Sequence, residues 1–349
     1  MIKSIYISEK KLHLRKAFKI TYEEVRNVDV IFLKITDSEG NIGLGSASPD
    51  THVTGETSKK IHTSLKKYLT EDFFNMPLDH WYRYHEKIQI RFRGLPTTQA
   101  CVEEALLNLF CNKYQIQLKN LFGGYRDTCQ TMMTIGVLPY EETLAQVRKN
   151  IKIGYKTIKL KCGLNVNEDI KKIRAVKKIL LKNHKLILDA NQGYNLQEAI
   201  KLLKSISSLK IDLIEEPVKG GRIKDLKTLK QLDTVPIVAD ESILSLSDAF
   251  RLLAEDIVDG VNIKLIKCGG PINFLNIFHL AKSLSKITMI GCNYESTISM
   301  TTSVHLALAL PIDFIDLDSG HLDFNDDPVK GGYTVHEGII KLKKGLALL

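Results

Sequence analysis

The chain has 349 residues, of which 44% are hydrophobic and 26% charged, enough to bury the core of one large domain and of a smaller second one. It has no apolar run long enough to cross a membrane, and its six cysteines include no C-x-x-C pair, so we expect a cytoplasmic protein with no membrane partner. The formal net charge of +9 would suit a nucleic-acid partner, but the lysines are dispersed and zinc-finger, RNA-recognition and P-loop signatures are missing, which favours a solvated lysine-rich surface.

Residues 1–115 predict a mixed α+β domain. Two strand-like segments come first, KSIYISEKKLHL and DVIFLKITDSEGNIGLGSAS, and two helical segments follow, TSKKIHTSLKKYL and TTQACVEEALLNLFCNKY. The Asp-Ser-Glu-Gly-Asn run between apolar stretches is a hairpin signal. We therefore expect a hairpin in this domain, followed by helices.

The next part of the chain, residues 116–322, predicts a parallel (β/α)7β barrel of the TIM type. Strand segments alternate with amphipathic helical segments: CQTMMTIGV, KTIKLKCG, KLILDANQG, IDLIEEPV, PIVADES, GVNIKLIKCGG, ITMIGCNYES and FIDLDSG. A doubly wound open sheet is the alternative, but it would require a glycine-rich first turn, which the sequence lacks. Residues 323–349 predict a tail that leaves the barrel and returns to the N-terminal domain.

Acids and lysines recur at the C-terminal ends of the predicted strands, where a barrel of this kind carries its chemistry. They are Lys159 and Lys161 on strand two, Asp189 and Asn191 on strand three, Glu215 and Glu216 on strand four, Asp240 and Glu241 on strand five, Lys264 on strand six, and Asp316 and Asp318 on strand eight. Any one of them could simply face water. Burying so many charges is costly unless a partner or a metal compensates, so a shared ionic site is the simpler explanation.

Three carboxylates on consecutive strands, Asp189, Glu215 and Asp240, are the predicted metal ligands. Because no His or Cys accompanies them, they suit a hard, oxygen-seeking cation, and we expect one Mg²⁺ per subunit, with Mn²⁺ as an alternative. Asn191 and Glu241 are expected to contact these ligands rather than the metal.

Lys161 and Lys264 are the predicted acid–base pair. Strands two and six of an eight-stranded barrel are diametrically opposed, so the two lysines should face each other across the mouth. One can remove the α-proton of a metal-bound carboxylate, giving a metal-stabilised enediolate, and the other can return a proton to the opposite face. A lysine base must be neutral, so its pKa must fall from its usual value of ~10.4. Lys159 is expected to lower that pKa by charge repulsion and to contact the substrate carboxylate.

These motifs resemble the enolase superfamily, and within it the muconate-lactonizing subgroup. The motifs are the K-x-K of Lys159 and Lys161, the three carboxylates, and Lys264 in KLIKCGG. The match covers nearly the whole chain and implies a capping domain, completed by the C-terminal tail, above the barrel. The D-L-D pair, Asp316 and Asp318, resembles the dipeptide epimerases, which hold the α-ammonium group of their substrate with it.

The resemblance implies an isomerase that epimerises the C-terminal residue of a dipeptide, L-Ala-X with X open. It also implies substrate contacts from Thr134, at the end of strand one, and from the strand-seven segment around Cys292 to Glu295. We expect a small dipeptide as the partner, and a homo-oligomer.

Two loops of the capping domain, about residues 17–27 and 46–57, would select the side chain X. Glutamate-specific relatives carry an arginine where this chain has Glu23, and an acid would repel a glutamate side chain. Either Arg26 or Lys19 substitutes through a shifted loop, or the enzyme prefers neutral or cationic residues.

Two other functions stay open. A muconate cycloisomerase or an o-succinylbenzoate synthase-like lyase of the same subgroup keeps the metal and the lysines, but leaves Asp316 and Asp318 without an ammonium group to bind. A catalytically silent, nucleic-acid-binding protein would instead place Lys161 and Lys264 on its outer surface.

Overall fold

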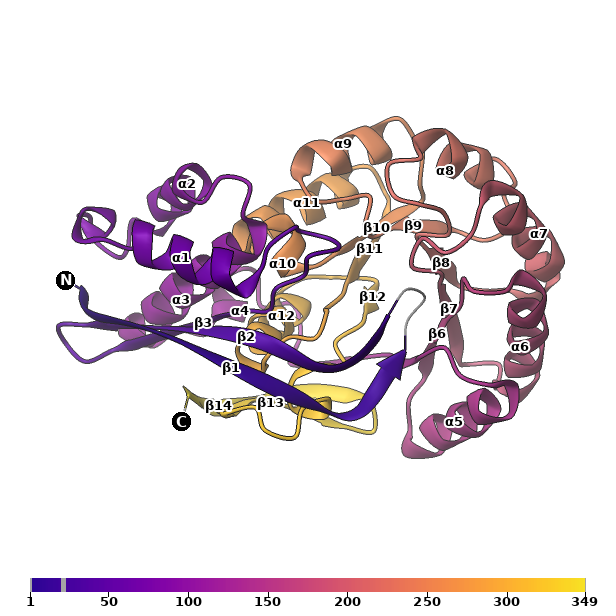
Figure 1. The fold of residues 1–349 in the computed structure, drawn as a ribbon, viewed down its shortest axis with the longest axis horizontal. Coiled ribbons are helices and arrows are strands. Elements are labelled where there is room, and N and C mark those ends of the chain that lie inside the picture. The colour runs from indigo at the N-terminus through magenta and orange to yellow at the C-terminus, as the bar shows by residue number, and fades with distance from the viewer. Residues whose placement is uncertain (1, 20–22, 349) are drawn as a thin grey trace.

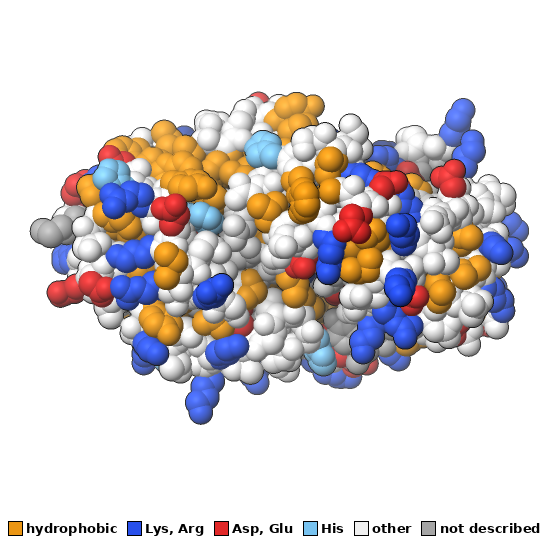
Figure 2. Space-filling view, turned by 90° about the horizontal axis from the view of Figure 1, so that it is seen from above, with side chains coloured by type: hydrophobic (Ala, Val, Ile, Leu, Met, Phe, Trp, Pro, Cys, Tyr) orange, Lys and Arg blue, Asp and Glu red, His pale blue; other side chains and the backbone are white. Residues whose placement is uncertain are grey.

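A barrel of parallel strands and an N-terminal α+β domain lie side by side, and a long hairpin from the N-terminal domain reaches across towards the barrel opening (Figure 1). The structure is a computed structural model that describes residues 2–19 and 23–348. No helix among these residues is both long enough and apolar enough to cross a lipid bilayer. Lys and Arg side chains are scattered among other side chains over the face seen in Figure 2.

The N-terminal domain is an antiparallel sheet covered by helices. Its strands are β1 (Ile2–Lys19), β2 (Glu24–Asp37) and β3 (Ile42–Ala47), and its helices are α1 (Ser58–Tyr68), η1 (Glu71–Phe74), α2 (Trp81–Arg91) and α3 (Pro96–Tyr114). The predicted hairpin turn is confirmed, because the Asp37 carboxylate accepts the N–H groups of Glu39 and Asn41. Gly43 lets β3 pack closely on α3, since a Cβ atom there would lie 2.1 Å from a backbone oxygen of the helix.

The barrel is built from parallel strands that pair in sequence order. They are β5 (Met133–Ile135), β6 (Thr157–Lys161), β7 (Lys185–Asp189), β8 (Leu213–Glu215), β9 (Ile237–Ala239), β10 (Gly260–Ile263), β11 (Ile287–Ile290) and β12 (Phe314–Ile315). A hydrogen bond of 2.9 Å from the Met132 N–H to the Ile315 carbonyl joins the last strand to the first. The predicted (β/α)7β barrel is therefore confirmed.

Helices connect these strands and surround them. They are α5 (Tyr140–Ile153), α6 (Val166–Ile179), α7 (Leu196–Ile206), α8 (Ile223–Lys230), α9 (Leu246–Ala254), α11 (Pro271–Ser283) and α12 (Thr297–Ala309), with the short segments η2 (Ser207–Leu209), α10 (Leu265–Cys268) and η3 (Gly320–Leu322), and with α4 (Leu118–Leu121) ahead of the barrel. Their buried faces pack on the outward side chains of the strands, such as Leu186 and Leu188 of β7.

The segment predicted as strand one, CQTMMTIGV, divides into two strands with different partners. Its first part is β4 (Thr128–Gln130), which pairs antiparallel with β14 (Ile339–Leu348), and β14 also pairs with β13 (Val329–His336). Only its second part, β5, belongs to the barrel. The tail thus joins β4, and it also contacts β1 through a bridge between Leu14 and Phe324. The domain boundaries stay a prediction.

An apolar layer fills the barrel beneath the strand ends. It contains Met132, Ile187, Leu213, Val238 and Met289, each at most 1% exposed. Because side chains two residues apart on a strand share a face, the next inward positions are the ends of the strands, and there the sequence changes to polar and charged residues. The charged residues therefore lie on an apolar floor.

Candidate active site

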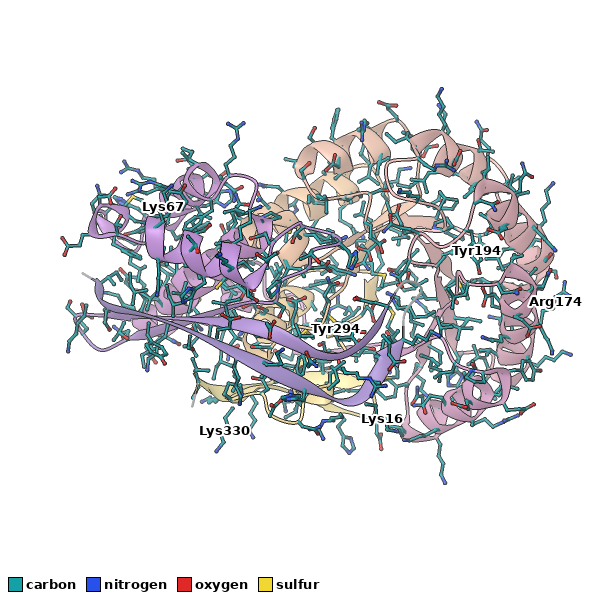
Figure 3. The ribbon with its side chains drawn as sticks, viewed as in Figure 1. Lys16, Lys67, Arg174, Tyr194, Tyr294 and Lys330 are labelled. Carbon is teal, nitrogen blue, oxygen red and sulfur yellow. The ribbon has the colours of Figure 1, made fainter. Side chains whose placement is uncertain are left out.

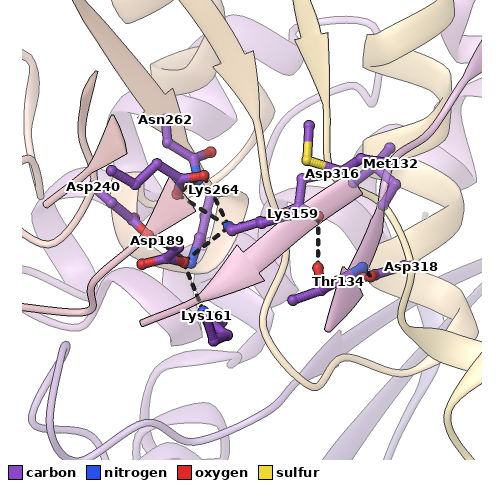
Figure 4. A network of polar contacts seen from close by, with 12 residues as sticks. Met132, Thr134, Lys159, Lys161, Asp189, Asp240, Asn262, Lys264, Asp316 and Asp318 are labelled. Carbon is purple, nitrogen blue, oxygen red and sulfur yellow. Dashed lines mark hydrogen bonds and ion pairs between the residues drawn. The ribbon is translucent and has the colours of Figure 1, made fainter. Parts of the chain in front are cut away.

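A cavity of about 400 Å³ lies at the carboxyl ends of the barrel strands, walled on one side by hairpin β1–β2. Among the residues that line it are most of the predicted site residues: Glu23, Thr134, Lys159, Lys161, Asn191, Asp240, Glu241, Lys264, Cys292, Asp316 and Asp318. Asp189 and Glu215 are fully buried, and both form ion pairs with Lys159, which lines the cavity. The structure therefore brings the predicted residues into one site, part of which Figure 4 shows.

Lys159 of β6 is buried among carboxylates. Its Nζ lies 3.0 Å from Asp189 Oδ2, 2.9 Å from Glu215 Oε1 and 2.7 Å from Asp316 Oδ2. Although burial opposes the charge, these carboxylates raise the pKa of Lys159 well above its ordinary value. Lys159 is therefore a firmly held ammonium group.

Lys161 ends β6 and Lys264 directly follows β10, and these strands are four places apart in the eight-stranded order, so the two lysines come from opposite sides of the closed barrel. Lys161 Nζ lies 2.6 Å from Asp189 Oδ2, and Lys264 Nζ lies 2.9 Å from Asp240 Oδ2. Against the penalty of burial, Asp240 raises the pKa of Lys264, which is opposite to what a base needs. A further positive charge bound to the carboxylates would weaken the ion pair between Lys264 and Asp240 and so lower the pKa of Lys264.

The three predicted metal ligands are fully buried but differ in their partners. Despite burial, Lys159 and Lys161 lower the pKa of Asp189, while burial raises the pKa of Glu215 to about 7. The pKa of Asp240 is lowered, against burial, by Lys264 and Lys267.

Two polar residues of this cluster were missed in the sequence. Lys267 is 1% exposed and pairs with the carboxylate and the carbonyl of Asp240. Asn262 Nδ2 donates to Glu215 Oε2 at 2.9 Å. Alternation along β10 could have indicated Asn262, because it shares a face with Lys264. Lys267 gives no such signal, since it lies on the short helix α10 that follows the strand.

The donor set fits a divalent cation. Among the described residues, no three His, Cys, Asp or Glu side chains already stand as a finished metal centre, since lysine ammonium groups lie against the carboxylates. Glu215 Oε1 and Asp240 Oδ2 lie in ion pairs with Lys159 and Lys264, at 2.9 Å each, but no aligned hydrogen-bond donor among the described residues completes their coordination. Acids also outnumber lysines in the cluster, which holds Asp189, Glu215, Glu216, Asp240, Glu241, Asp316 and Asp318 against Lys159, Lys161, Lys264 and Lys267. A cation among hard oxygen donors would restore the balance.

The two aspartates of the D-L-D motif have different partners. Asp316 Oδ2 is held by the Lys159 ammonium at 2.7 Å, whereas Asp318 Oδ2 accepts the backbone N–H of Thr134 at 2.8 Å. Burial is the main cause, and the negative charge of the neighbouring Asp316 is a second cause, of a pKa of Asp318 that is raised to about 6. Of the two aspartates, Asp318 is thus the one that forms no ion pair with a lysine or arginine in the part of the chain that the structure describes.

The capping loops face the same cavity. Glu23 and Phe18 line it from hairpin β1–β2, and Phe18 packs edge-on against Tyr294, which is labelled in Figure 3, with ring centroids 6.1 Å apart. Arg26 does not turn towards the cavity, because its guanidinium binds Glu24 at 2.6 Å. Residues 20–22 of the first predicted loop lie outside the described residues.

The barrel and its site define a class of protein: an α/β-barrel enzyme with opposed lysines and buried carboxylates at the carboxyl end of its strands. Residues 142–347 match the family described as Enolase C-terminal domain-like. The chain belongs to this family, which confirms the family resemblance.

Relatives match over almost the whole length. The L-Ala-D/L-Glu epimerase of Clostridium acetobutylicum is 36% identical over 343 residues, which cover 97% of this chain and 96% of that protein. The substrate-liganded complex of the L-Ala-D/L-Glu epimerase from Bacillus subtilis has a TM-score of 0.94 at 30% identity and covers 99% of both chains. The dipeptide epimerase from Methylococcus capsulatus, complexed with Mg and the dipeptide L-Arg-D-Lys, has a TM-score of 0.91 at 30% identity, over 99% of this chain and 98% of that one.

Proposed function

We propose that this chain is an Mg²⁺-dependent dipeptide epimerase that inverts the α-carbon of the C-terminal residue of an L-Ala-X dipeptide. The observation that carries this proposal is the placement of Lys161 and Lys264 on opposite strands around one cavity that is floored by buried carboxylates. Inversion at carbon needs a proton to leave one face and another to arrive at the other face. Two amines on opposite sides supply both steps.

Each group in the cavity has a part in this reaction. Asp189, Glu215 and Asp240 would hold Mg²⁺, which when bound would draw electron density from the substrate carboxylate and so acidify the α-proton. Lys161 Nζ takes the α-proton, and Lys264 Nζ gives a proton to the opposite face; the reverse reaction exchanges these parts.

The dipeptide is oriented by charges at its two ends. The Lys159 ammonium lies where it can pair with the substrate carboxylate, and the Asp318 carboxylate receives the substrate ammonium. The Thr134 N–H fixes Asp318 in place at 2.8 Å. Relatives named or crystallised as dipeptide epimerases support this assignment. Those relatives act on or bind both acidic and basic dipeptides, and Glu23 at the rim favours a neutral or cationic residue X over glutamate.

The test follows proton exchange and epimer formation by NMR in D₂O with Mg²⁺, using L-Ala-L-Glu, L-Ala-L-Leu and L-Ala-L-Lys. We expect loss of the α-proton signal of the C-terminal residue and appearance of its epimer with at least one dipeptide, and neither in EDTA. Replacing either lysine, Lys161→Ala or Lys264→Ala, should slow epimerisation by about 100-fold or more. Calorimetry should show that Asp240→Asn loses Mg²⁺ binding. A wild-type protein that exchanges no α-proton from any of the three dipeptides is not a dipeptide epimerase of this kind.

A further inference from the structure

Each of the opposed lysines is held by an asparagine, and the two asparagines lie on different strand ends. Lys161 Nζ donates to Asn191 Oδ1 at 2.8 Å, just after β7. Lys264 Nζ donates to Asn293 Oδ1 at 3.1 Å, just after β11. A lysine side chain has four rotatable bonds, so such a contact decides where its amine points.

The two asparagines are anchored in different parts of the molecule. Asn191 Nδ2 donates to Glu241 Oε1 at 3.1 Å, so the support of Lys161 lies within the barrel. Asn293 Nδ2 donates to Asp50 Oδ2 at 2.8 Å, and Asp50 belongs to the capping loop that follows β3. The support of Lys264 therefore extends into the N-terminal domain.

Asp50 is itself a fixed anchor. Its Oδ1 accepts the backbone N–H groups of His52 at 3.0 Å and Val53 at 2.9 Å, and its carbonyl accepts the Thr54 hydroxyl at 2.9 Å. This local turn leaves Oδ2 directed to Asn293. A movement of the loop would thus be transmitted through Asn293 to Lys264.

The stem of Lys264 has little freedom to adopt another course. Gly291 lies beside it, and a Cβ atom at that position would come within 3.0 Å of Lys264 Cε. The amine then lies between Asp240 Oδ2 at 2.9 Å and Asn293 Oδ1 at 3.1 Å. Without the asparagine, the amine would keep its ion pair with Asp240 but would lose its direct link to the capping loop.

We propose that Asn293 is a positioning residue that couples capping loop 46–57, through Asp50, to proton transfer by Lys264, while Lys161 is positioned independently within the barrel. This inference rests on the proposed function. The two proton transfers would then depend differently on the N-terminal domain. The capping loop supports transfer by Lys264 directly and does not support transfer by Lys161.

The substrate for the test is whichever of L-Ala-L-Glu, L-Ala-L-Leu and L-Ala-L-Lys the wild-type protein converts fastest. The rate of α-proton exchange is measured separately, starting from each of its two epimers. The full chain with Mg²⁺ is used, at times before the opposite epimer accumulates. Lys161→Ala and Lys264→Ala serve as references, because each should retain exchange only from the epimer that faces the remaining lysine. They assign one epimer to each amine.

We expect Asn293→Ala to slow exchange from the Lys264 epimer by about 10-fold or more, and to change exchange from the Lys161 epimer by about twofold at most. Asn191→Ala is the matched variant and should show the opposite pattern. Asp50→Ala should act on the same epimer as Asn293→Ala. If Asn293→Ala does not fold, Asn293→Asp keeps the volume of the side chain but sets a carboxylate against Asp50, and it should give the same one-sided loss.

A purely structural role would slow exchange from both epimers equally. If Asn293→Ala and Asn293→Asp each slow exchange equally from the two epimers, or slow it from neither, the inference is overturned, while an active wild-type enzyme leaves the proposed function intact. A wild-type protein without exchange would instead overturn the proposed function, and this inference with it.

Discussion

The two lysines of the K-x-K motif differ in how their charges are compensated. Lys159 Nζ has three carboxylates around it, whereas Lys161 Nζ has one carboxylate and the neutral amide of Asn191. Proton transfer requires an amine that can exist without its charge, and removing the charge of Lys159 would leave several buried acids unpaired. This contrast supports the assignment of Lys161, rather than Lys159, as the base.

Asp318 offers the sharpest test of the substrate class. Replacing it with asparagine removes the negative charge expected to hold the substrate ammonium, and truncating one side of a buried charge pair costs enough that kcat/KM for the dipeptide should fall about 30-fold or more. Asp318→Asn is preferable to Asp316→Asn, because Asp316 also pairs with Lys159.

Asp323→Asn provides the control for this variant, since Asp323 lines the same cavity and burial raises its pKa to about 7. The measurement is kcat/KM by polarimetry or NMR. If Asp318→Asn converts dipeptides as fast as the wild-type protein, the ammonium site is wrong and the cycloisomerase or lyase alternative gains support.

At the scale of strands and helices, much of the site could be predicted because alternation along a strand is a strong rule. Asp189, Glu215 and Asp240 each follow a buried apolar residue by two positions, and the parallel barrel places all three at one edge. The rule fails where the chain leaves the strand. Lys267 is brought inward by helix α10, and the contact between Asp50 and Asn293 joins loops that are 243 residues apart.

The segment between β11 and α12 joins the barrel to the N-terminal domain through buried acids. Glu295 is 1% exposed, and its Oε1 accepts the Asn293 N–H at 2.9 Å. Burial raises the pKa of Glu295 from its ordinary 4.5 to about 7. Burial and the nearby Glu295 raise the pKa of Glu104, on α3, well above its usual range. The packing of the barrel against the N-terminal domain at this point is therefore most favourable when Glu295 and Glu104 are both neutral.

The linkage predicts a stability that declines with pH. Because the folded protein favours neutral Glu295, this contribution is complete below about pH 4.5 and is lost as the pH rises through about 7, a change of about 3 kcal/mol. Glu295→Gln cannot titrate. Its free energy of unfolding, measured in urea at about pH 5 and pH 8, should therefore rise relative to the wild-type protein by about that amount.

Glu86→Gln, an exposed glutamate on α2, is the control for removing one negative charge. A difference between Glu295→Gln and the wild-type protein that stays constant with pH would show that Glu295 titrates as it does in the unfolded chain.

For the molecule as a whole, the tail is part of the barrel core. Ile340 of β14 is fully buried in the same cluster as the side chains between strands and helices, and Tyr333 of β13 joins it there. The tail also packs on β1, where Leu346 contacts the cluster that contains Leu12 and Phe32. Sequence alone predicted that the tail returns, but not that β4 leaves the barrel to receive it, because strand propensity does not specify a partner.

Ile340→Ala should lower the free energy of unfolding by about 2–5 kcal/mol, since it opens a cavity in this shared core. Ile339→Ala is the matched control: Ile339, next to Ile340 in the chain, is 43% exposed, and a change of about 0.5 kcal/mol or less is expected. Unfolding is followed by the fluorescence of Trp81, the only tryptophan, which lies on α2, and by far-UV circular dichroism, to which the barrel helices contribute most. Both signals should shift together; a Trp81 transition unchanged by Ile340→Ala would show that the N-terminal domain unfolds independently.

The wall formed by hairpin β1–β2 is made of residues such as Leu14, Phe18 and Glu23, far in the chain from the lysines and acids of the barrel. Mutations that reshape this wall can accumulate without disturbing the groups that handle protons. Proteins with this architecture can therefore evolve a new substrate specificity while the reaction that they catalyse stays the same.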